Sequence, residues 1–212
     1  MPRPKVILQS EFPYHVSGRC INKEWFTIPM PEVWTVMERQ LWFIKNAYGV
    51  KIYAFVLMSN HFHLLIGTPL ANLSDVMENF MGETSRALTW AGNRINQTYC
   101  GRYHRCLINK EHYFRHAYKY VYRNPVRAGI VEKVEQYKYS TLFGLLGMQH
   151  LLIPVEEDYL LISKTEETLE WLNSSPVIKD ESTIKSALYK KIFTLPKDVM
   201  DKRESHLETD AL

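Results

Sequence analysis

Hydrophobic positions in four short segments follow the pattern of β-strands. β-branched and aromatic residues are concentrated there, and apolar and polar side chains alternate most clearly at the start of the third segment. The Ser59-Asn60 pair separates the second segment from the third, which is typical of a hairpin of two neighbouring, largely buried strands. The predicted strands are residues 14–21, 50–58, 61–67 and 102–108.

Three longer segments have the pattern of helices. Apolar residues recur at helical spacing over residues 31–47 and 73–91, and Ser74 is a capping-type residue at the start of the second of these. Residues 110–123 are rich in charged and aromatic side chains and precede Pro125, so we expect a third helix that stops before this proline.

The order of these elements indicates the fold class. Strand, helix, strand, strand, helix, strand and helix in succession favour an α+β sandwich with a mainly antiparallel sheet. The ferredoxin-like plan, with helices packed on one face of the sheet, is the simplest arrangement with this order.

The chain changes character after about Gly147. Residues 150–212 contain thirteen acidic and eight basic side chains, and two short helical patterns lie at 165–172 and 183–193. We therefore predict a catalytic domain over residues 1–147 and an acidic, partly helical extension over 148–212, with a frayed, disordered end from Lys197.

Composition narrows the class of protein. The chain has 212 residues, 46% of them hydrophobic, which is enough to bury a core. Its longest apolar run, residues 53–58, is far shorter than the roughly 20 residues of a membrane span, and the first residues lack a secretory apolar core, so we expect a soluble cytoplasmic protein without a membrane partner. Its three cysteines lack CxxC spacing and fit reduced thiols better than a disulfide framework or a zinc site.

The net charge of +3 conceals a strongly basic middle segment. Residues 84–138 hold eleven Lys or Arg and three Glu, interleaved with Trp90, Tyr99 and Tyr103. Arginines beside aromatic rings suit a nucleic acid, because phosphates are neutralised and bases stack. A solvated basic face without a partner explains the charge equally well, so the motifs must decide.

A histidine pair lies in the third predicted strand. His61 and His63 flank Phe62, so in a strand both imidazoles leave on one face, about 7 Å apart, while Phe62 enters the core. Two imidazoles on one face can share a cation; ordinary hydrogen-bonded histidines are the alternative.

The third predicted helix carries a polar stripe. Its members recur every four residues and therefore share a face: His112, His116, Tyr120 and Asn124. Tyr118 and Tyr122 lie roughly opposite Tyr120, and we expect them to pack. From the helix alone, packing would explain all of its tyrosines.

Three segments resemble a known family when they are taken in order and spacing. SNHFHLLIG, GRYHRCLI and YKYVYRNPVRAGIV are similar to the HUH single-tyrosine transposases, and within them to the REP-associated tyrosine transposases and their insertion-sequence relatives. The resemblance covers roughly residues 5–145.

This resemblance implies roles for individual residues. His61 and His63 would hold a divalent cation, Mg²⁺ or Mn²⁺, and Tyr120, five residues before Pro125, would be the nucleophile. Asn124 stands where relatives often place a glutamine as third ligand. His116, one turn before Tyr120, is a candidate to help remove its proton, with a phosphate or surface hydrogen bond as the alternative.

The activity implied is metal-dependent cleavage and rejoining of single-stranded DNA beside a hairpin, through a 5′-phosphotyrosine. The alternatives are a regulator that binds hairpin DNA without cutting it, a phosphoesterase in which water attacks, and an RNA-binding domain. We expect the protein to act at the nucleoid, as a monomer or a homodimer. The candidate DNA-binding residues are Arg19, Arg102, Tyr103, Arg105, Arg123 and Arg127.

Two positions depart from the family pattern. Ser59 stands where many relatives have a proline, and YKYSTL at 137–142 replaces a segment that often contains tryptophan. We expect these departures to affect DNA recognition or local geometry more than the chemistry.

Overall fold

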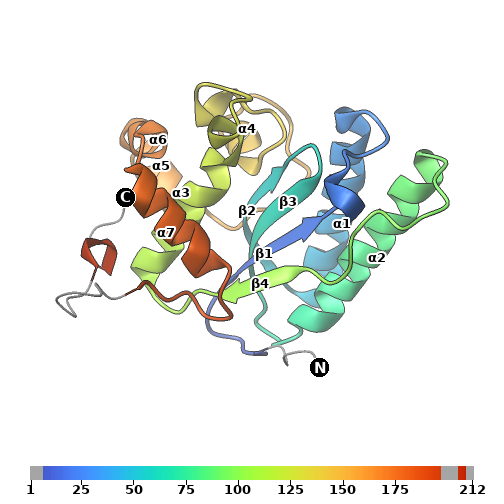
Figure 1. Cartoon of the computed structure of the whole chain (residues 1–212), viewed down its shortest axis with the longest axis horizontal. Helices are drawn as coiled ribbons and strands as arrows, with labels where there is room; N and C mark the ends of the chain where they lie inside the picture. The colour runs from blue at the N-terminus through green and yellow to red at the C-terminus, as the bar shows by residue number, and fades with distance from the viewer. Residues whose placement is uncertain (1–6, 197–204, 209–212) are drawn as a thin grey trace.

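The computed structural model describes residues 7–196 and 205–208, and its centre is a single antiparallel sheet (Figure 1). The strand order is β2-β3-β1-β4, and every neighbouring pair is antiparallel. With the helices between them, these strands give the ferredoxin-like order, which confirms the predicted α+β class. The strands are β1 (Tyr14–Arg19), β2 (Lys51–Leu57), β3 (His61–Gly67) and β4 (His104–Leu107).

Helices α1 (Met30–Tyr48) and α2 (Leu73–Ala91) cover one face of the sheet. Both were expected within a residue of their bounds, because their apolar positions recur at helical spacing. Phe62 and Val16 point into this layer and are fully buried with Phe80 of α2. This side of the sheet holds the larger part of the core.

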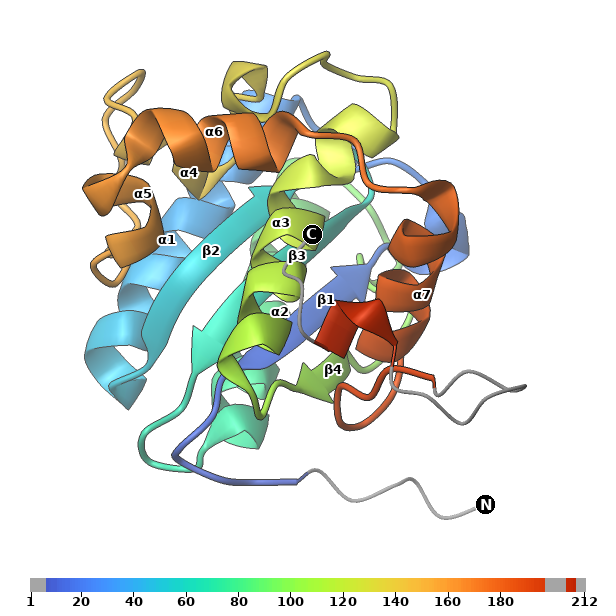
Figure 2. The ribbon, with the colours of Figure 1, turned by 90° about the vertical axis from the view of Figure 1, so that its left-hand side faces the viewer.

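Helix α3 (Glu111–Arg127) lies across the opposite face, where only one covered face was expected. Figure 2 shows it in front of the strands, with the sheet between it and α2. Strand residues on this side are also apolar, and Val56, Leu65 and Cys106 pack with α3 in a second core. The sheet is therefore buried on both faces. The sequence did not predict this, because the strands are short and their alternation of apolar and polar residues is imperfect.

The prediction that the third helix ends before Pro125 is wrong, because α3 continues to Arg127. Proline has no N–H to give to the carbonyl of residue 121, four positions earlier. The side-chain amide of Asn124 compensates: its Nδ2 donates to the carbonyl of Tyr120 at 2.8 Å and to that of Val121 at 3.4 Å. A local side chain thus stabilises a helix that the proline rule alone would end.

Four more helices follow in the described part of the chain, and two of them, α6 and α7, pack against α3 (Figure 1). The helix expected at 165–172 is confirmed, whereas the one expected at 183–193 begins earlier, at Ile178, and ends at Leu188. The helices are α4 (Thr141–Leu145), α5 (Tyr159–Ser163), α6 (Thr165–Asn173) and α7 (Ile178–Leu188). The described residues also form short 3₁₀ turns: η1 (Ile21–Lys23), η2 (Val134–Gln136) and η3 (His206–Glu208).

The later part of the chain also covers both edges of the sheet. At the β4 edge, Leu107 donates to the carbonyl of Lys191 at 2.9 Å, and its own carbonyl accepts from Phe193 at 2.8 Å. At the β2 edge, Leu57 donates to the carbonyl of Tyr139 and the carbonyl of Ile52 accepts from Glu156. Residues after 138 therefore satisfy backbone groups that an open edge would expose to other chains.

The end of the chain is only partly described. Of the segment from Lys197 that was expected to be frayed, residues 197–204 and 209–212 lie outside the described residues. No helix in the described part of the chain is long and apolar enough to cross a membrane.

Candidate active site

The histidine pair lies on the face of the sheet that α3 covers. In the register of β1 with β3, Arg19 is opposite His61 and Ser17 is opposite His63. Phe62 is on the other face and is fully buried, as the alternation of a strand requires. The ring centroids of His61 and His63 are 5.0 Å apart.

One nitrogen of each imidazole is occupied by a neighbour. Nδ1 of His63 is 2.9 Å from Nε2 of His15, and Nδ1 of His61 is 2.7 Å from Oδ1 of Asn60. Neither Nε2 atom has a hydrogen bond with another residue that the structure describes. These two nitrogens are therefore the ones available to a ligand.

The surroundings keep the imidazoles neutral. Burial, and then Arg19 and Arg127, lower the pKa of His61 to about 4. Burial is also the main reason that the pKa of His63 is well below its usual value, with the neighbouring histidines and the same arginines adding to it. A neutral imidazole offers a lone pair, so both side chains are in the form that binds a cation at neutral pH.

Tyr120 of α3 lies beside the histidines where the helix packs against the sheet. Its ring centroid is 5.7 Å from that of His63 and 6.0 Å from that of His15, both edge to face. The Tyr120 side chain is almost completely buried, and burial raises the pKa of its hydroxyl.

Arg127, two turns later on α3, partly offsets this effect. Its Nη2 donates to the Tyr120 hydroxyl at 3.2 Å, and its guanidinium carbon is 4.7 Å from the centre of the ring. Both the charge and the hydrogen bond of Arg127 lower the pKa of Tyr120. The phenol thus has a cation beside its oxygen, which favours the ionised form.

Asn124 joins the same group through Arg127. Its Nδ2 is held by backbone carbonyls of α3, so Oδ1 points away from the helix backbone and accepts from Nη2 of Arg127 at 3.2 Å. A carbonyl oxygen has two lone pairs, so this contact leaves one for a further partner. Arg127 therefore links Asn124 to Tyr120, whose ring lies beside that of His63.

These side chains fit a divalent cation. The ligand set is two neutral imidazoles with free Nε2 atoms and one amide oxygen. Mn²⁺ binds both nitrogen and oxygen ligands of this kind, whereas Mg²⁺ prefers the oxygen. No group of three or more His, Cys, Asp or Glu is placed to hold a metal among the described residues. The candidate site thus depends on Asn124, or on oxygen atoms from outside the chain, to complete the coordination.

His116 lies one turn before Tyr120 but makes its contacts elsewhere. It is fully buried, its Nε2 is 2.8 Å from the carbonyl of Leu207, and its ring is parallel to that of Phe193. Its Nε2 therefore contacts the C-terminal segment, while its Nδ1 has no hydrogen-bond partner among the described residues.

Arg123, a candidate for DNA binding, is also occupied within the protein. Its Nη1 donates to the carbonyls of Leu172 and Asn173 at 2.9 and 3.0 Å, at the end of α6. Its side chain is buried, so its charge stabilises a helix C-terminus and is not presented to a ligand.

The remaining DNA-binding candidates fall into two groups. Arg19 and Arg127 lie on the α3 side, and each lowers the pKa of both His61 and His63 by its charge. Tyr103 is buried in the core under α1 and α2, and Arg105, opposite Val16, is on that same face of the sheet. Arg102 is exposed in the loop before β4.

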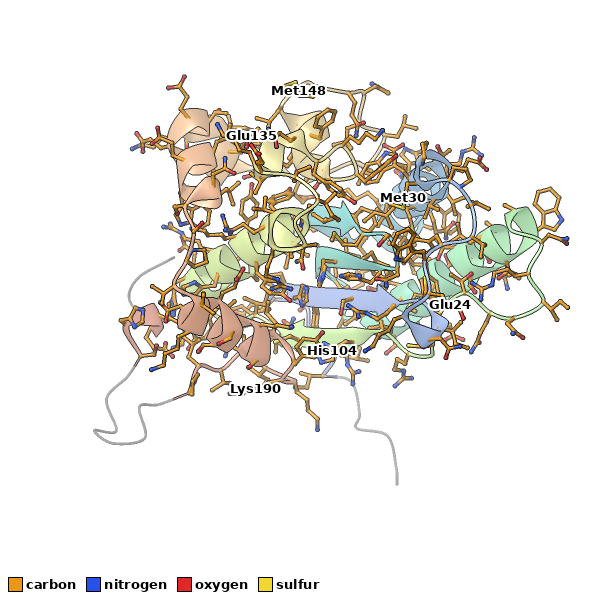
Figure 3. All side chains as sticks on the ribbon, turned by 45° about the horizontal axis from the view of Figure 1, so that its top comes forward. Glu24, Met30, His104, Glu135, Met148 and Lys190 are labelled. Atoms are coloured by element: carbon orange, nitrogen blue, oxygen red, sulfur yellow. The ribbon has the colours of Figure 1, made fainter. Side chains whose placement is uncertain are left out.

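His15 and Asn60 are the residues that the sequence analysis missed. Alternation along β1 places His15 on the same face as Ser17 and Arg19, but its neighbour on β3 follows only from the strand register. Figure 3 shows the side chains between the sheet and α3, with the labelled His104 at the β4 edge. His104 shares the His15 face but bonds to the carbonyl of Tyr189.

Comparison with known proteins gives a family match. The family model described as "Transposase IS200 like" matches residues 14–137. No curated protein matches the chain.

Two solved structures are similar to this one. One is a REP-associated tyrosine transposase bound to a REP hairpin: the TM-score is 0.59 and the identity 17%, over 74% of this chain and 93% of that one. The other is a candidate transposase from Deinococcus radiodurans, with a TM-score of 0.40 and 20% identity, over 57% of this chain and 95% of that one. The first likeness supports the fold described above.

Proposed function

Because the chain belongs to the IS200-like transposase family, we propose that it cuts and rejoins single-stranded DNA through a covalent link to Tyr120. One observation carries the proposal. The Tyr120 ring lies 5.7 Å from that of His63, and its hydroxyl accepts from Arg127. The proposed nucleophile thus lies beside a proposed cation ligand and a positive charge.

In the proposed reaction the Tyr120 oxygen attacks a phosphorus of the DNA backbone. The new O–P bond replaces the bond from phosphorus to the 3′-oxygen, which leaves with a proton as a 3′-hydroxyl, while the 5′-phosphate stays on the tyrosine. One phosphodiester bond is exchanged for another, so a second 3′-hydroxyl can reverse the step without ATP. Cutting and joining are then the same reaction in two directions.

Arg127 would act on the attacking oxygen. Its hydrogen bond and charge favour the phenolate against the burial that disfavours it. We assign His116 no part in this scheme, because its Nε2 is bound to the carbonyl of Leu207 and it makes no hydrogen bond with Tyr120 in the described part of the chain.

A divalent cation, Mg²⁺ or Mn²⁺, would be held by His61, His63 and Asn124. When bound, it would neutralise charge on the non-bridging phosphate oxygens and so make phosphorus more electrophilic. The neutral imidazoles and their free Nε2 atoms support this assignment.

The proposed substrate is single-stranded DNA beside a hairpin. Arg19, Arg102 and Arg127 are the cations that we assign to its phosphates, since the first and last act on the histidines by their charge and the second is exposed in the loop before β4. The similar solved structure contains a transposase bound to a REP hairpin, which supports a hairpin as the partner here. We propose residues 1–147 as the catalytic unit and 148–212 as an extension that supports α3 and the sheet edges, in a cytoplasmic protein at the nucleoid.

The test is a covalent adduct between protein and DNA. Incubation with a hairpin oligonucleotide and Mn²⁺ should give a slow-migrating, denaturation-resistant band that Tyr120→Phe abolishes. Tyr118→Phe and Tyr122→Phe are matched controls from the same helix, since both hydroxyls bond within the core, to Asp158 and Thr141. Binding without cleavage would indicate a regulator, and metal-dependent cleavage without an adduct would indicate attack by water.

A further inference from the structure

His15 is a buried histidine to which the proposed reaction gives no role. It lies on β1 with Leu65 and Cys106 as its strand neighbours, where an apolar side chain would fit. Only 3% of its surface is exposed, and its Nδ1 has no hydrogen-bond partner in the described part of the chain. Burying such an atom is costly, so a purely packing role would favour another residue.

The contact that His15 does make is with a proposed metal ligand. Its Nε2 is 2.9 Å from Nδ1 of His63, and the two rings are stacked with centroids 5.1 Å apart. At this distance one nitrogen must carry the hydrogen and the other must accept it. The direction of this bond decides which nitrogen of His63 is free to bind a metal.

We infer that His15 and Asn60 are positioning residues that fix the tautomers of His63 and His61. This inference rests on the proposed metal site at those two histidines. In this arrangement each ligand carries its hydrogen on Nδ1 and donates it outward, His63 to Nε2 of His15 and His61 to Oδ1 of Asn60. Both Nε2 lone pairs then remain free for a metal.

The orientation of Asn60 supports this assignment for His61. Nδ2 of Asn60 donates to the carbonyl of Lys23 at 2.7 Å, so its oxygen must be the atom that faces His61. An amide oxygen only accepts, so Nδ1 of His61 must be the donor. Its Nε2 is therefore unprotonated whenever the ring is neutral.

The same requirement sets the direction of the His15 bond. If His15 donated to His63, the hydrogen of His63 would lie on Nε2 and would block coordination there. Outer partners of metal-bound histidines commonly fix the ring and its tautomer in this way. His15 also lies against the proposed nucleophile, since its ring meets that of Tyr120 edge to face with centroids 6.0 Å apart. It would therefore fix the position of His63 relative to Tyr120.

Nitrogen NMR on the metal-free protein tests the tautomers directly. With ¹⁵N-labelled histidine, and with signals assigned by replacing single histidines, long-range ¹⁵N–¹H spectra distinguish Nδ1–H from Nε2–H rings. We expect His61 and His63 to be Nδ1–H, and His63 to lose this preference in His15→Leu. An Nε2–H ring at His63 in the wild type would overturn the inference.

Metal affinity provides a second readout. We expect Mn²⁺ binding, measured by electron paramagnetic resonance, to weaken about 10- to 100-fold in His15→Leu and Asn60→Leu. His15→Gln should recover part of the loss, because its amide oxygen can accept from His63. His104→Gln is the matched control, since it lies on the same sheet face but bonds to Tyr189, and it should bind as the wild type does.

Circular dichroism and thermal unfolding would verify that each variant folds, and a misfolded His15→Leu would be replaced by His15→Phe. If Cd²⁺ shifted the His15 Nε2 signal as it does that of a ligand, His15 would bind metal itself and the positioning role would be refuted. The tautomers are measured without DNA, so the two proposals can fail separately. If the adduct forms but His63 is Nε2–H, this inference is refuted and the proposed reaction stands. Correct tautomers without any adduct would refute only the proposed reaction.

Discussion

Arg127 could act on the Tyr120 hydroxyl during the reaction, or only bind a DNA phosphate. Replacing it with methionine separates these two roles. Its Nη2 donates at 3.2 Å to both the Tyr120 hydroxyl and Asn124, and its charge lowers the pKa of Tyr120. A hydrogen bond to a charged group contributes about 1.5–3 kcal/mol. Because Arg127 is exposed and screened by solvent, we take the lower half of this range, about 1.5–2 kcal/mol.

This energy corresponds to a rate that is lower by about 10- to 30-fold. The assay is single-turnover formation of the covalent adduct, with the protein in excess over a hairpin oligonucleotide and saturating Mn²⁺. DNA affinity is measured separately, by fluorescence anisotropy at several salt concentrations. Arg127→Lys is the matched control, which keeps the charge but not the planar geometry, and its rate should fall between those of the wild type and Arg127→Met.

An unchanged adduct rate at saturating DNA would refute this reasoning. If affinity and the salt dependence of binding fell while the rate did not, Arg127 would be a phosphate contact only. A loss of one phosphate contact reduces the slope of log affinity against log salt by about one. That result would leave Tyr120 without a local group that favours its ionised form.

Three further predictions concern stability and are measured by urea unfolding. Arg123→Met should lower the free energy of unfolding by about 2–3 kcal/mol, because it removes two charge-assisted bonds at the end of α6, and should leave DNA affinity unchanged; a loss of affinity without a loss of stability would contradict this. Gly18→Ala should cost about 1–3 kcal/mol, because its Cβ would lie 2.6 Å from Cε1 of the buried Phe62, and Phe62→Leu should reduce that cost; additive costs would contradict the steric reason. Burial, and then Arg123, lower the pKa of Lys119 to about 8, so the unfolded chain binds more protons between about pH 8 and 10.5. The stability of the wild type relative to Lys119→Met should therefore rise with pH in that window, by at most about 1.4 kcal/mol per pH unit, and a flat difference would contradict the shift.

Local patterns predicted most of the fold. The strand of His61 and His63 and the helix from Leu73 to Ala91 were identified within a residue, because each is long or strongly periodic. The continuation of α3 through Pro125 was not predicted, because the Asn124 side chain donates to the carbonyl of Val121, which the proline leaves free, and to that of Tyr120. Non-local packing also decided that α3 covers the second face of the sheet.

Some residues of the candidate site could likewise be predicted from local motifs, whereas others depend on partners far away in the sequence. Tyr120, Asn124 and the two histidines were named from motifs, and the structure places the tyrosine ring beside that of His63. Arg123 has the same charge and nearly the same place in the sequence as Arg127, yet it points to the end of α6. Two arginines four residues apart on one helix cannot be told apart until their partners are known, and the partners of Arg123 come from residues about 50 positions later.

Mapping the attachment site of the DNA tests the central claim most directly. After reaction with a hairpin oligonucleotide and Mn²⁺, nuclease trimming and fragmentation mass spectrometry would locate the remaining nucleotide on the peptides around residue 120. The account predicts a 5′-linked nucleotide on Tyr120. A nucleotide on Tyr118 or Tyr122, or cleaved DNA with no modified tyrosine, would contradict it.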